Sequence, residues 1–406
     1  MISVDDALAA VLARFTPLPP EDTPILSALG QVIAEDVVAD FDVPPLTNAA
    51  MDGYAVRAQD TRGATADRPV RLRVIEDLPA GRCASQPVTP GTAIRIMTGA
   101  PLPDGADTVV QFELTGEGAG RPRGDEVEIH AEAKPRVNIR QAGEDLAAGR
   151  VTLPAGTLVR PGEVGLLATM GRASVRVHRR PRVAILSTGD EVLEPGQPLA
   201  PGKIYDANSF TIAAMVQRAG GVPLRLGVAR DDVDELVRRV EQLERADLLV
   251  TSAGVSVGDY DVVKQALNRD GQVTFYQVQM RPGRPLAFGS LAGVPLLGLP
   301  GNPVASAISF ELFGRPAIMR MLGRRGWERP AMRARFDGEI DNYDNRRSFY
   351  RVRVEGGVAR LTGPQGSGIL SSMAMANGLM VIPEEVRRVE PGDEVTIRLF
   401  ESPEDE

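Results

Sequence analysis

The 406-residue sequence predicts a multidomain α+β and α/β protein with a central doubly wound α/β domain, an inserted β domain before it and a C-terminal β barrel. Three observations predict this class. The length exceeds what one hydrophobic core normally supports. Strand-like and helix-like runs alternate between Arg182 and Arg320. Short strand-like runs separated by Pro and Gly fill much of the chain on either side.

The chain opens with a predicted amphipathic helix. Ser3 and Asp6 form a capping pair, and apolar residues follow at helical spacing from Val4 to Phe15. From about Val43 to Arg136 short alternating runs predict a small antiparallel β domain. These runs cover 70–74, 92–97, 108–113 and 126–129.

The central segment predicts a sheet with helical crossovers. Val183 to Leu186 is strand-like, Asn208 can cap a helix that stops at Gly220, Asp232 can cap the next helix, and a buried strand follows at Leu248. Ligands of such sheets bind beyond the carboxyl ends of the strands. Four loops are therefore expected to meet at one rim: 187–191, 230–232, 251–261 and 298–303. Further short strands are expected at 332–336, 349–354 and 394–400.

The composition excludes several kinds of chemistry. Two histidines and one cysteine leave little material for a His/Cys zinc site, a Ser-His-Asp triad or a disulfide framework. A formal charge of −8 argues against a nucleic-acid surface. Carboxylates, hydroxyls, arginines and main-chain dipoles remain, which favours transfer of a phosphoryl or adenylyl group with a divalent cation.

The loop after Leu248 carries the strongest functional signal. Small residues and hydroxyls, with Ser252, Gly254 and Ser256 as ligand candidates, let backbone N–H groups approach a phosphate, although a solvated turn is the simpler alternative. Carboxylates follow at Asp259 and Asp261. Because carboxylates beside bound phosphate would repel it, a cation between them is expected, and Mg²⁺ fits that position.

Other loops on the rim have both a functional and a structural interpretation. Glu191 and Asp231 are candidate ligands, but acidic residues at these positions also suit a turn or a helix start. Arg281 and Arg284 flank a rigid Pro-Gly turn that can bind oxyanions bidentately or can simply be solvated. The turn at Pro300, Gly301 and Asn302 ends a strand, and Pro303 can begin the next helix. The amides of this turn are also expected to face a ligand.

Together the motifs resemble the MoeA/gephyrin E-domain family of molybdopterin molybdenumtransferases. The resemblance spans essentially the whole chain in order. It is carried by Asn48-Ala-Ala-Met-Asp-Gly-Tyr-Ala-Val56, Arg95-Ile-Met-Thr-Gly-Ala-Pro101, Gly143-Glu-Asp145, Ser187-Thr-Gly-Asp-Glu191, Gly258-Asp-Tyr-Asp261 and Leu299-Pro-Gly-Asn-Pro303.

The resemblance implies four domains and a homodimer. The domains would be an elongated N-terminal domain (1–43 plus 139–177), an inserted β domain (44–138), a central molybdopterin-binding α/β domain (178–328) and a C-terminal β barrel (329–406). The active cleft would combine the central domain of one subunit with the β insert of the other. The implied reaction inserts molybdate into adenylylated molybdopterin with release of AMP, with Mg²⁺ as cofactor.

The resemblance also assigns site residues. Catalytic roles are expected for Asp52, Thr98, Asp145, Glu191, Asp231 and Asp261. The last three of these are expected to hold the Mg²⁺. Substrate or molybdate binding is expected at Ser252, Gly254, Ser256, Arg281, Arg284, Pro300, Gly301, Asn302, Arg351, Ser367 and Ser372.

Three departures from the family pattern bear on the ligand. Arg281 and Arg284 stand where the family usually has lysines, in a chain where only three of the 46 basic residues are lysines. Each Arg keeps the positive charge and gains fork geometry. Ala253 replaces a usual Gly, and Ala305 replaces a usual Ser hydroxyl.

Two other functions remain open at the level of sequence. A gephyrin-like scaffold would bind an amphipathic peptide between domains, and a molybdopterin adenylyltransferase would share the central α/β fold. No secretion signal or membrane span is recognisable, so a cytoplasmic protein is expected. Transient contacts with other molybdenum cofactor enzymes are also expected.

Overall fold

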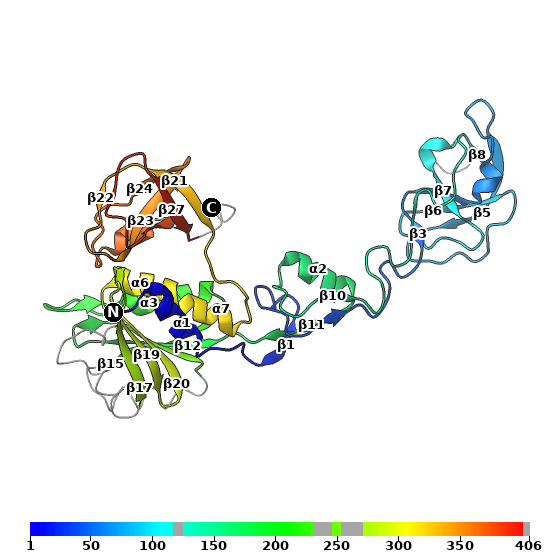
Figure 1. Ribbon diagram of the computed structural model, residues 1–406. Helices are drawn as coiled ribbons and strands as arrows, with labels where there is room; N and C mark the ends of the chain where they lie inside the picture. The colour runs from blue at the N-terminus through cyan, green and yellow to red at the C-terminus, as the bar shows by residue number, and fades with distance from the viewer. Residues whose placement is uncertain (117–124, 230–245, 253–270, 401–406) are drawn as a thin grey trace. The chain divides into compact units, whose positions relative to one another are not determined.

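Figure 1 shows the computed structural model of the chain, which describes residues 1–116, 125–229, 246–252 and 271–400. The chain forms two compact units. The first comprises Met1–Ala34, Leu158–Arg160 and Arg176–Glu406, and the second comprises Glu35–Thr157 and Pro161–Val175. The four domain ranges expected from the resemblance are finer than this division and stay a prediction.

The first unit is built on a six-stranded sheet in which four parallel strands continue into two antiparallel strands. All five residues of β16 (Leu248–Ser252) are buried, which is typical of a parallel strand covered on both faces. The predicted α/β fold is therefore confirmed. The strand order is β15 (Val222–Ala229), β12 (Arg182–Thr188), β16 (Leu248–Ser252), β20 (Val294–Leu299), β19 (Pro285–Leu291) and β17 (Gly271–Gln277).

Helices share a core with this sheet. Val11 and Ile212 belong to one apolar cluster with Val183 and Val250 of the strands. The backbone N–H of Asp6 donates to Ser3 Oγ over 3.0 Å, as the capping pair predicts. The helical segments are α1 (Val4–Leu12), α3 (Asn208–Arg218), α6 (Pro303–Ser309), the π-helical turn η3 (Phe310–Gly314) and α7 (Arg315–Met321).

The start of α3 differs from the prediction. Asn208 is the first residue of the helix and not its cap, and its side-chain Nδ2 donates to the Gly301 carbonyl over 2.7 Å. The capping role belongs to Asp206, whose Oδ1 accepts the backbone N–H of Ser209 over 3.0 Å. The prediction was wrong because Asp206 and Asn208 are both good capping residues, and tertiary contacts decide between them.

The C-terminal part of the first unit is the predicted β barrel. Five strands close on themselves because β25 pairs with both β27 and β23. The short strand β18 (Met280–Arg281) also joins β23, so that the barrel is hydrogen-bonded to the segment before β19. The barrel strands are β21 (Ala331–Phe336), β23 (Arg347–Glu355), β24 (Val358–Leu361), β25 (Gly378–Ile382) and β27 (Glu394–Leu399). Beside them lie β22 (Ile340–Asp341), α8 (Leu370–Ala374) and β26 (Arg388–Val389).

The second unit contains the predicted insert as a five-stranded sheet. The expectation of a wholly antiparallel sheet was wrong, because β5 and β6 run parallel. The long connection between these two strands allows a crossover that a tight hairpin could not make. The order is β7 (Thr108–Gln111), β4 (Gly53–Val56), β6 (Thr92–Ile96), β5 (Val70–Leu78) and β8 (Glu126–Ile129).

Short ladders and helices complete the described chain. Paired strands are β1 (Pro20–Pro24) with β11 (Ser174–His178), β2 (Val37–Val38) with β10 (Val151–Leu153), β3 (Asn48–Ala49) with β9 (Ile139–Arg140), and β13 (Val192–Leu193) with β14 (Ile204–Tyr205). The remaining helices are η1 (Ala58–Thr61), η2 (Phe112–Leu114) and α2 (Pro161–Thr169). Among the described residues, no helix is both long and apolar enough to cross a membrane.

Candidate active site

A pocket of about 370 Å³ in the first unit brings together many of the predicted ligand residues. It is lined by segments around β18, the turn before α6, β23 and the loop after β24. Four arginines line it, and none of its described lining residues is a carboxylate. Such a pocket suits an anion. The predicted residues that line it are Arg281, Arg284, Pro300, Asn302, Arg351 and Ser367.

Backbone hydrogen bonds hold the two sides of this pocket together. In the β18–β23 pair Arg281 lies opposite Ser348, and the next three residues of β23, Phe349 to Arg351, line one wall of the pocket. The N–H of Val304 at the start of α6 donates to the carbonyl of Ser367 over 3.0 Å. Residues far apart in sequence thus reach one pocket because the barrel is joined to the α/β domain at two points.

Arg351 is the buried cation of this pocket. Its side chain is 1% exposed, and burial lowers the pKa of Arg351 to about 10. Its Nε donates to Ser372 Oγ over 3.0 Å, and its Nη2 donates to the carbonyls of Pro364 and Gly366 at 3.3 and 3.1 Å. Among the described residues its partners are neutral, so the guanidinium keeps its charge available for a ligand. Ser372 lies behind Arg351 and holds it, whereas Ser367 lines the pocket itself.

The turn that carries Arg281 and Arg284 requires its glycine. Gly283 has φ +101°, and a Cβ there would lie 2.6 Å from Ser309 Oγ. Arg284 donates from Nη2 to the side-chain oxygen of Gln277 over 2.7 Å. Both guanidinium groups thus extend from a turn that is tightly packed against α6.

The next turn places Pro300 and Asn302 in the pocket but leaves Gly301 outside its lining. Pro303 occupies the first helical position of α6, as predicted, because its missing N–H has no partner to lose there. Ala305 lines the pocket from this helix. The expected contact of the turn's amides with a ligand stays a prediction.

The carboxyl ends of β12 and β16 carry a buried hydroxyl and carboxylate cluster. Ser187 donates from Oγ to Asp206 Oδ1 over 2.9 Å and lies 3.1 Å from Ser252 Oγ. Ser209 donates from Oγ to Asp206 Oδ2 over 2.5 Å. Ser252 therefore has a local partner already. Asp206 was not among the predicted residues, although its position three residues before Ser209 is a capping signal.

Part of the predicted metal site is described. Glu191 follows β12, and its exposed carboxylate makes no hydrogen bond or ion pair among the described residues. Within the ranges the structure describes, no three His, Cys, Asp or Glu side chains form a group that could hold a metal. Asp231, Asp261, Gly254 and Ser256 lie outside the described residues. Glu191 thus presents exposed carboxylate oxygens, the kind of ligand that a hard cation such as Mg²⁺ prefers.

The second unit brings two further predicted residues together. Asp52 Oδ1 accepts the backbone N–H and the hydroxyl of Thr98, each over 2.7 Å. The backbone hydrogen bond from Thr98, followed by its hydroxyl, lowers the pKa of Asp52 below its usual value. Asp145 is exposed in a turn, where its N–H donates to the Val43 carbonyl over 3.0 Å. Asp52 is therefore held as an exposed carboxylate.

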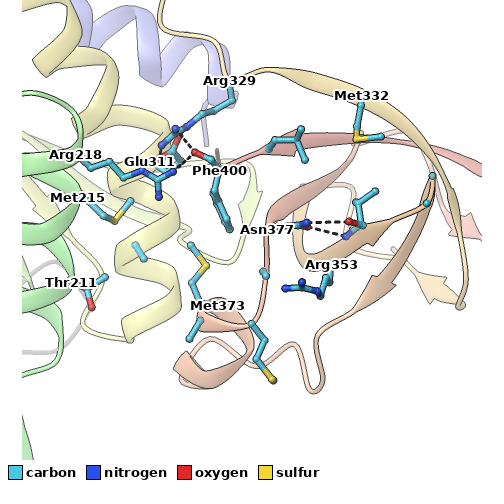
Figure 2. A pocket seen from close by; sticks show the side chains of 18 residues that line it. Thr211, Met215, Arg218, Glu311, Arg329, Met332, Arg353, Met373, Asn377 and Phe400 are labelled. Atoms are coloured by element: carbon cyan, nitrogen blue, oxygen red, sulfur yellow. Dashed lines mark hydrogen bonds and ion pairs between the residues drawn. The ribbon is translucent and has the colours of Figure 1, made fainter. Parts of the chain in front are cut away.

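Figure 2 shows a second, larger cavity of about 610 Å³ between α3, α6 and the barrel. Its lining is rich in methionine and contains none of the predicted site residues. Arg329 donates to Glu311 over 2.8 Å, and both Arg329 and Arg218 donate to the Phe400 carbonyl at 2.5 Å. Its cations are thus engaged within the protein, and the arginine pocket is the better site for an anion. The methionines are Met215, Met332, Met373 and Met375.

The fold and pocket define a class: multidomain α/β proteins that bind an anionic ligand where a doubly wound sheet domain meets a β barrel. Three family models match in order. The "MoeA N-terminal region (domain I and II)" covers 2–171, the "Probable molybdopterin binding domain" covers 184–320, and the "MoeA C-terminal region (domain IV)" covers 333–400. The chain belongs to the MoeA family.

Individual relatives agree over nearly their full lengths. Molybdopterin molybdenumtransferase 2 of Mycobacterium tuberculosis is 41% identical over 406 residues, covering 98% of this chain and 99% of the relative. The Haemophilus influenzae molybdopterin molybdenumtransferase is 34% identical over 411 residues, with 98% and 99% covered. A crystal structure of the molybdopterin biosynthesis MoeA protein from Pyrococcus horikoshii has a TM-score of 0.85 and 35% identity, with 99% and 100% covered. The family resemblance inferred from the motifs is confirmed.

Proposed function

We propose that this chain is a molybdopterin molybdenumtransferase, which inserts molybdate into adenylylated molybdopterin and releases AMP. The names of its full-length relatives support an enzyme of molybdenum cofactor biosynthesis. The observation that carries the proposal is the pocket with four arginines, one of them the buried Arg351 with neutral partners.

The pocket has the chemistry that a tetrahedral oxyanion needs. Guanidinium forks bind such oxygens bidentately, and a buried cation attracts an anion more strongly than an exposed cation does. Ser367 and Gln365 add neutral polar side chains to the lining. Arg281, Arg284 and Arg351 therefore bind and orient molybdate, and Ser372 keeps Arg351 in place.

Mg²⁺ belongs to this proposal as a cofactor held by Glu191, Asp231 and Asp261. Bound there, the ion would neutralise negative charge on the departing AMP phosphate. The exposed carboxylate of Glu191, three residues after the end of β12, supports this position, since ligands of doubly wound sheets bind at that edge.

Asp52, Thr98 and Asp145 complete the proposed site from the second unit. In a homodimer the β insert of one subunit would supply them to the central domain of the other. The exposed, ionised carboxylate of Asp52 supports a role at a surface that meets substrate or a second subunit. A cytoplasmic location and transient transfer of the product to other molybdenum cofactor enzymes also belong to this proposal.

The test is release of AMP from adenylylated molybdopterin in the presence of molybdate and Mg²⁺. We expect turnover that EDTA abolishes and added Mg²⁺ restores. Absence of turnover together with tight peptide binding would favour the scaffold. Consumption of ATP without molybdate would favour the adenylyltransferase.

A variant of the proposed metal site sharpens this test. Asp261→Asn should lower AMP release by about 100-fold while the protein stays folded, because loss of a metal-binding carboxylate removes charge from the ion's site. Asp337→Asn is the control, since within the described part of the chain that exposed carboxylate pairs with Arg360 alone, at 2.8 Å in the barrel. Near-normal release by folded Asp261→Asn would remove Asp261 from the mechanism.

A further inference from the structure

Asp344 lies beside the arginine pocket, in the loop between β22 and β23. Its carboxylate ion-pairs with Arg346 and lies 3.4 Å from Arg281 Nη1 through Oδ2. Both arginines line the pocket. The hydrogen bond from Arg346 is the main reason that the pKa of Asp344 is below its usual value, so this group is an anion at neutral pH.

Hydrogen bonds on both sides of Asp344 hold this loop in place. Asn342 is fully buried, and its Oδ1 accepts the hydroxyl of Ser348 over 2.8 Å. Gln279 Nε2 donates to the carbonyl of Asn345 over 2.6 Å, which ties the loop to the segment that carries Arg281. The hydrogen bonds of Asn342 and Asn345 therefore fix the position of Asp344 beside the pocket arginines.

The pocket's four arginines differ in the kind of partner they have. Arg351 and Arg284 have neutral partners, namely a hydroxyl, carbonyls and a side-chain amide. Arg281 and Arg346 share Asp344, the one carboxylate that ion-pairs with a pocket arginine among the described residues. The pocket thus keeps the positive charge of Arg351 and Arg284, while a carboxylate of the protein neutralises part of the charge of Arg281 and Arg346.

We propose that Asp344 is an internal competitor for the oxyanion: it holds Arg281 and Arg346 while the pocket is empty, and the incoming oxyanion displaces it. This inference rests on the proposed use of the pocket for oxyanion binding. Exposed ion pairs are weak, so a doubly charged oxyanion already held by Arg351 can take over Arg281. Asp344 is therefore a positioning residue that sets anion affinity and favours release.

The test compares Asp344→Asn with Asp341→Asn by calorimetric titration of the full-length protein with molybdate and with sulfate. Asp341 ends the neighbouring strand β22, is exposed and carries the same charge, and among the described residues no hydrogen bond or ion pair joins it to a pocket arginine. Asp344→Asn should bind both anions about two- to fivefold more tightly, the range expected for loss of one exposed competing charge. Asp341→Asn should bind as the wild type does.

A double-mutant cycle with Arg281→Gln separates competition from general electrostatics. If Asp344 acts through Arg281, the gain from Asp344→Asn should shrink when Arg281 is replaced. Unchanged or weaker binding by Asp344→Asn, an equal gain in Asp341→Asn, or no binding of either anion by any variant would overturn the inference.

AMP release distinguishes this inference from the proposed function. An active enzyme in which Asp344→Asn lowers the KM for molybdate more than it changes kcat supports both. Tighter anion binding by Asp344→Asn without any AMP release would support Asp344 as a competitor and refute the transferase function. Normal AMP release with unchanged anion affinity in Asp344→Asn would refute the competitor alone.

Discussion

At the scale of single residues, the informative feature is a buried arginine, Arg351, that has no acidic partner among the described residues. A guanidinium inside a protein normally pairs with a carboxylate, because burial removes its hydration. Arg315 illustrates this, since its Nε donates to Glu311 Oε1 over 2.6 Å in the same unit. Arg351 has instead a serine hydroxyl and two carbonyls. An oxyanion ligand is the counter-charge that this arrangement lacks.

Arg351→Gln should weaken molybdate binding at least about tenfold, since it removes a charge-assisted hydrogen-bond donor from the pocket. Arg353→Gln is the control, because Arg353 lies two residues further along β23 and ion-pairs with Glu355 at 2.5 Å. Calorimetric titration with molybdate measures both. Equal affinities of the two variants would show that Arg351 does not contact the anion.

The pH dependence of the same binding follows from the lowered pKa of Arg351. The cationic form binds the anion and is lost as the pH rises through about 10, so wild-type affinity should be flat between roughly pH 7 and 9 and fall above that. A bound anion stabilises the cationic form of Arg351, so the loss of affinity shifts to higher pH. In Arg351→Gln the fall near pH 10 should be absent.

At the scale of the elements, close strand packing explains the glycine of the motif at 48–56. A Cβ on Gly53 of β4 would lie 2.1 Å from the carbonyl oxygen of Val110 in the neighbouring β7. The backbone of β7 cannot move aside to make room for this Cβ, as the end of a flexible side chain could. The glycine between Asp52 and Tyr54 is thus required by the approach of two strands, and Asp52 lies just before that contact.

Gly53→Ala should destabilise the sheet of the second unit by about 3 kcal/mol, the upper end of the cost of overpacking. Gly165→Ala should instead stabilise the same unit by about 0.5–1 kcal/mol, because Gly165 is exposed in α2 and a Cβ there meets nothing within 4 Å. Hydrogen exchange of the amides in β4, β6 and β7 measures the first effect, and the amides of α2 measure the second. Unchanged exchange in β4 of Gly53→Ala would contradict the close approach.

At the scale of the whole molecule, the proposed site draws on residues from both compact units. Arg351 and Glu191 belong to the first unit, and Asp52 and Thr98 belong to the second. A homodimer in which each site combines the first unit of one subunit with the second unit of its partner makes a specific prediction about mixed dimers.

Asp52→Asn and Arg351→Gln, each inactive alone, should recover activity when they are unfolded and refolded as a mixture. Random pairing makes half of the dimers mixed, and each mixed dimer has one intact site, so AMP release should reach about a quarter of the wild-type value. A mixture as inactive as its parents, with mixed dimers demonstrated by differential tagging, would place each site within one subunit.

Local interactions explain which predictions succeeded. The Ser3 cap, the buried run in β12 and the start of α6 at Pro303 depend on neighbouring residues, and the sequence displays those neighbours. The cap at Asp206 and the parallel pairing of β5 with β6 were missed, because contacts between distant segments select among locally equivalent choices. Arg346 and Gln365 gave no local signal of a place in the pocket, since only barrel closure brings them there.

The sequence by itself determined the family, the α/β and β-barrel architecture and the candidate arginines, because periodicity and short motifs are local properties of the chain. Only the tertiary structure decided that Arg281, Arg284 and Arg351 line one pocket and that Ser372 supports Arg351 from behind. It also decided that Asp344 ion-pairs with Arg281 and Arg346. These contacts join residues up to 70 positions apart in the sequence, such as those of β18 and β23. Contacts across such separations form only when the chain folds, so no local pattern in the sequence reveals them.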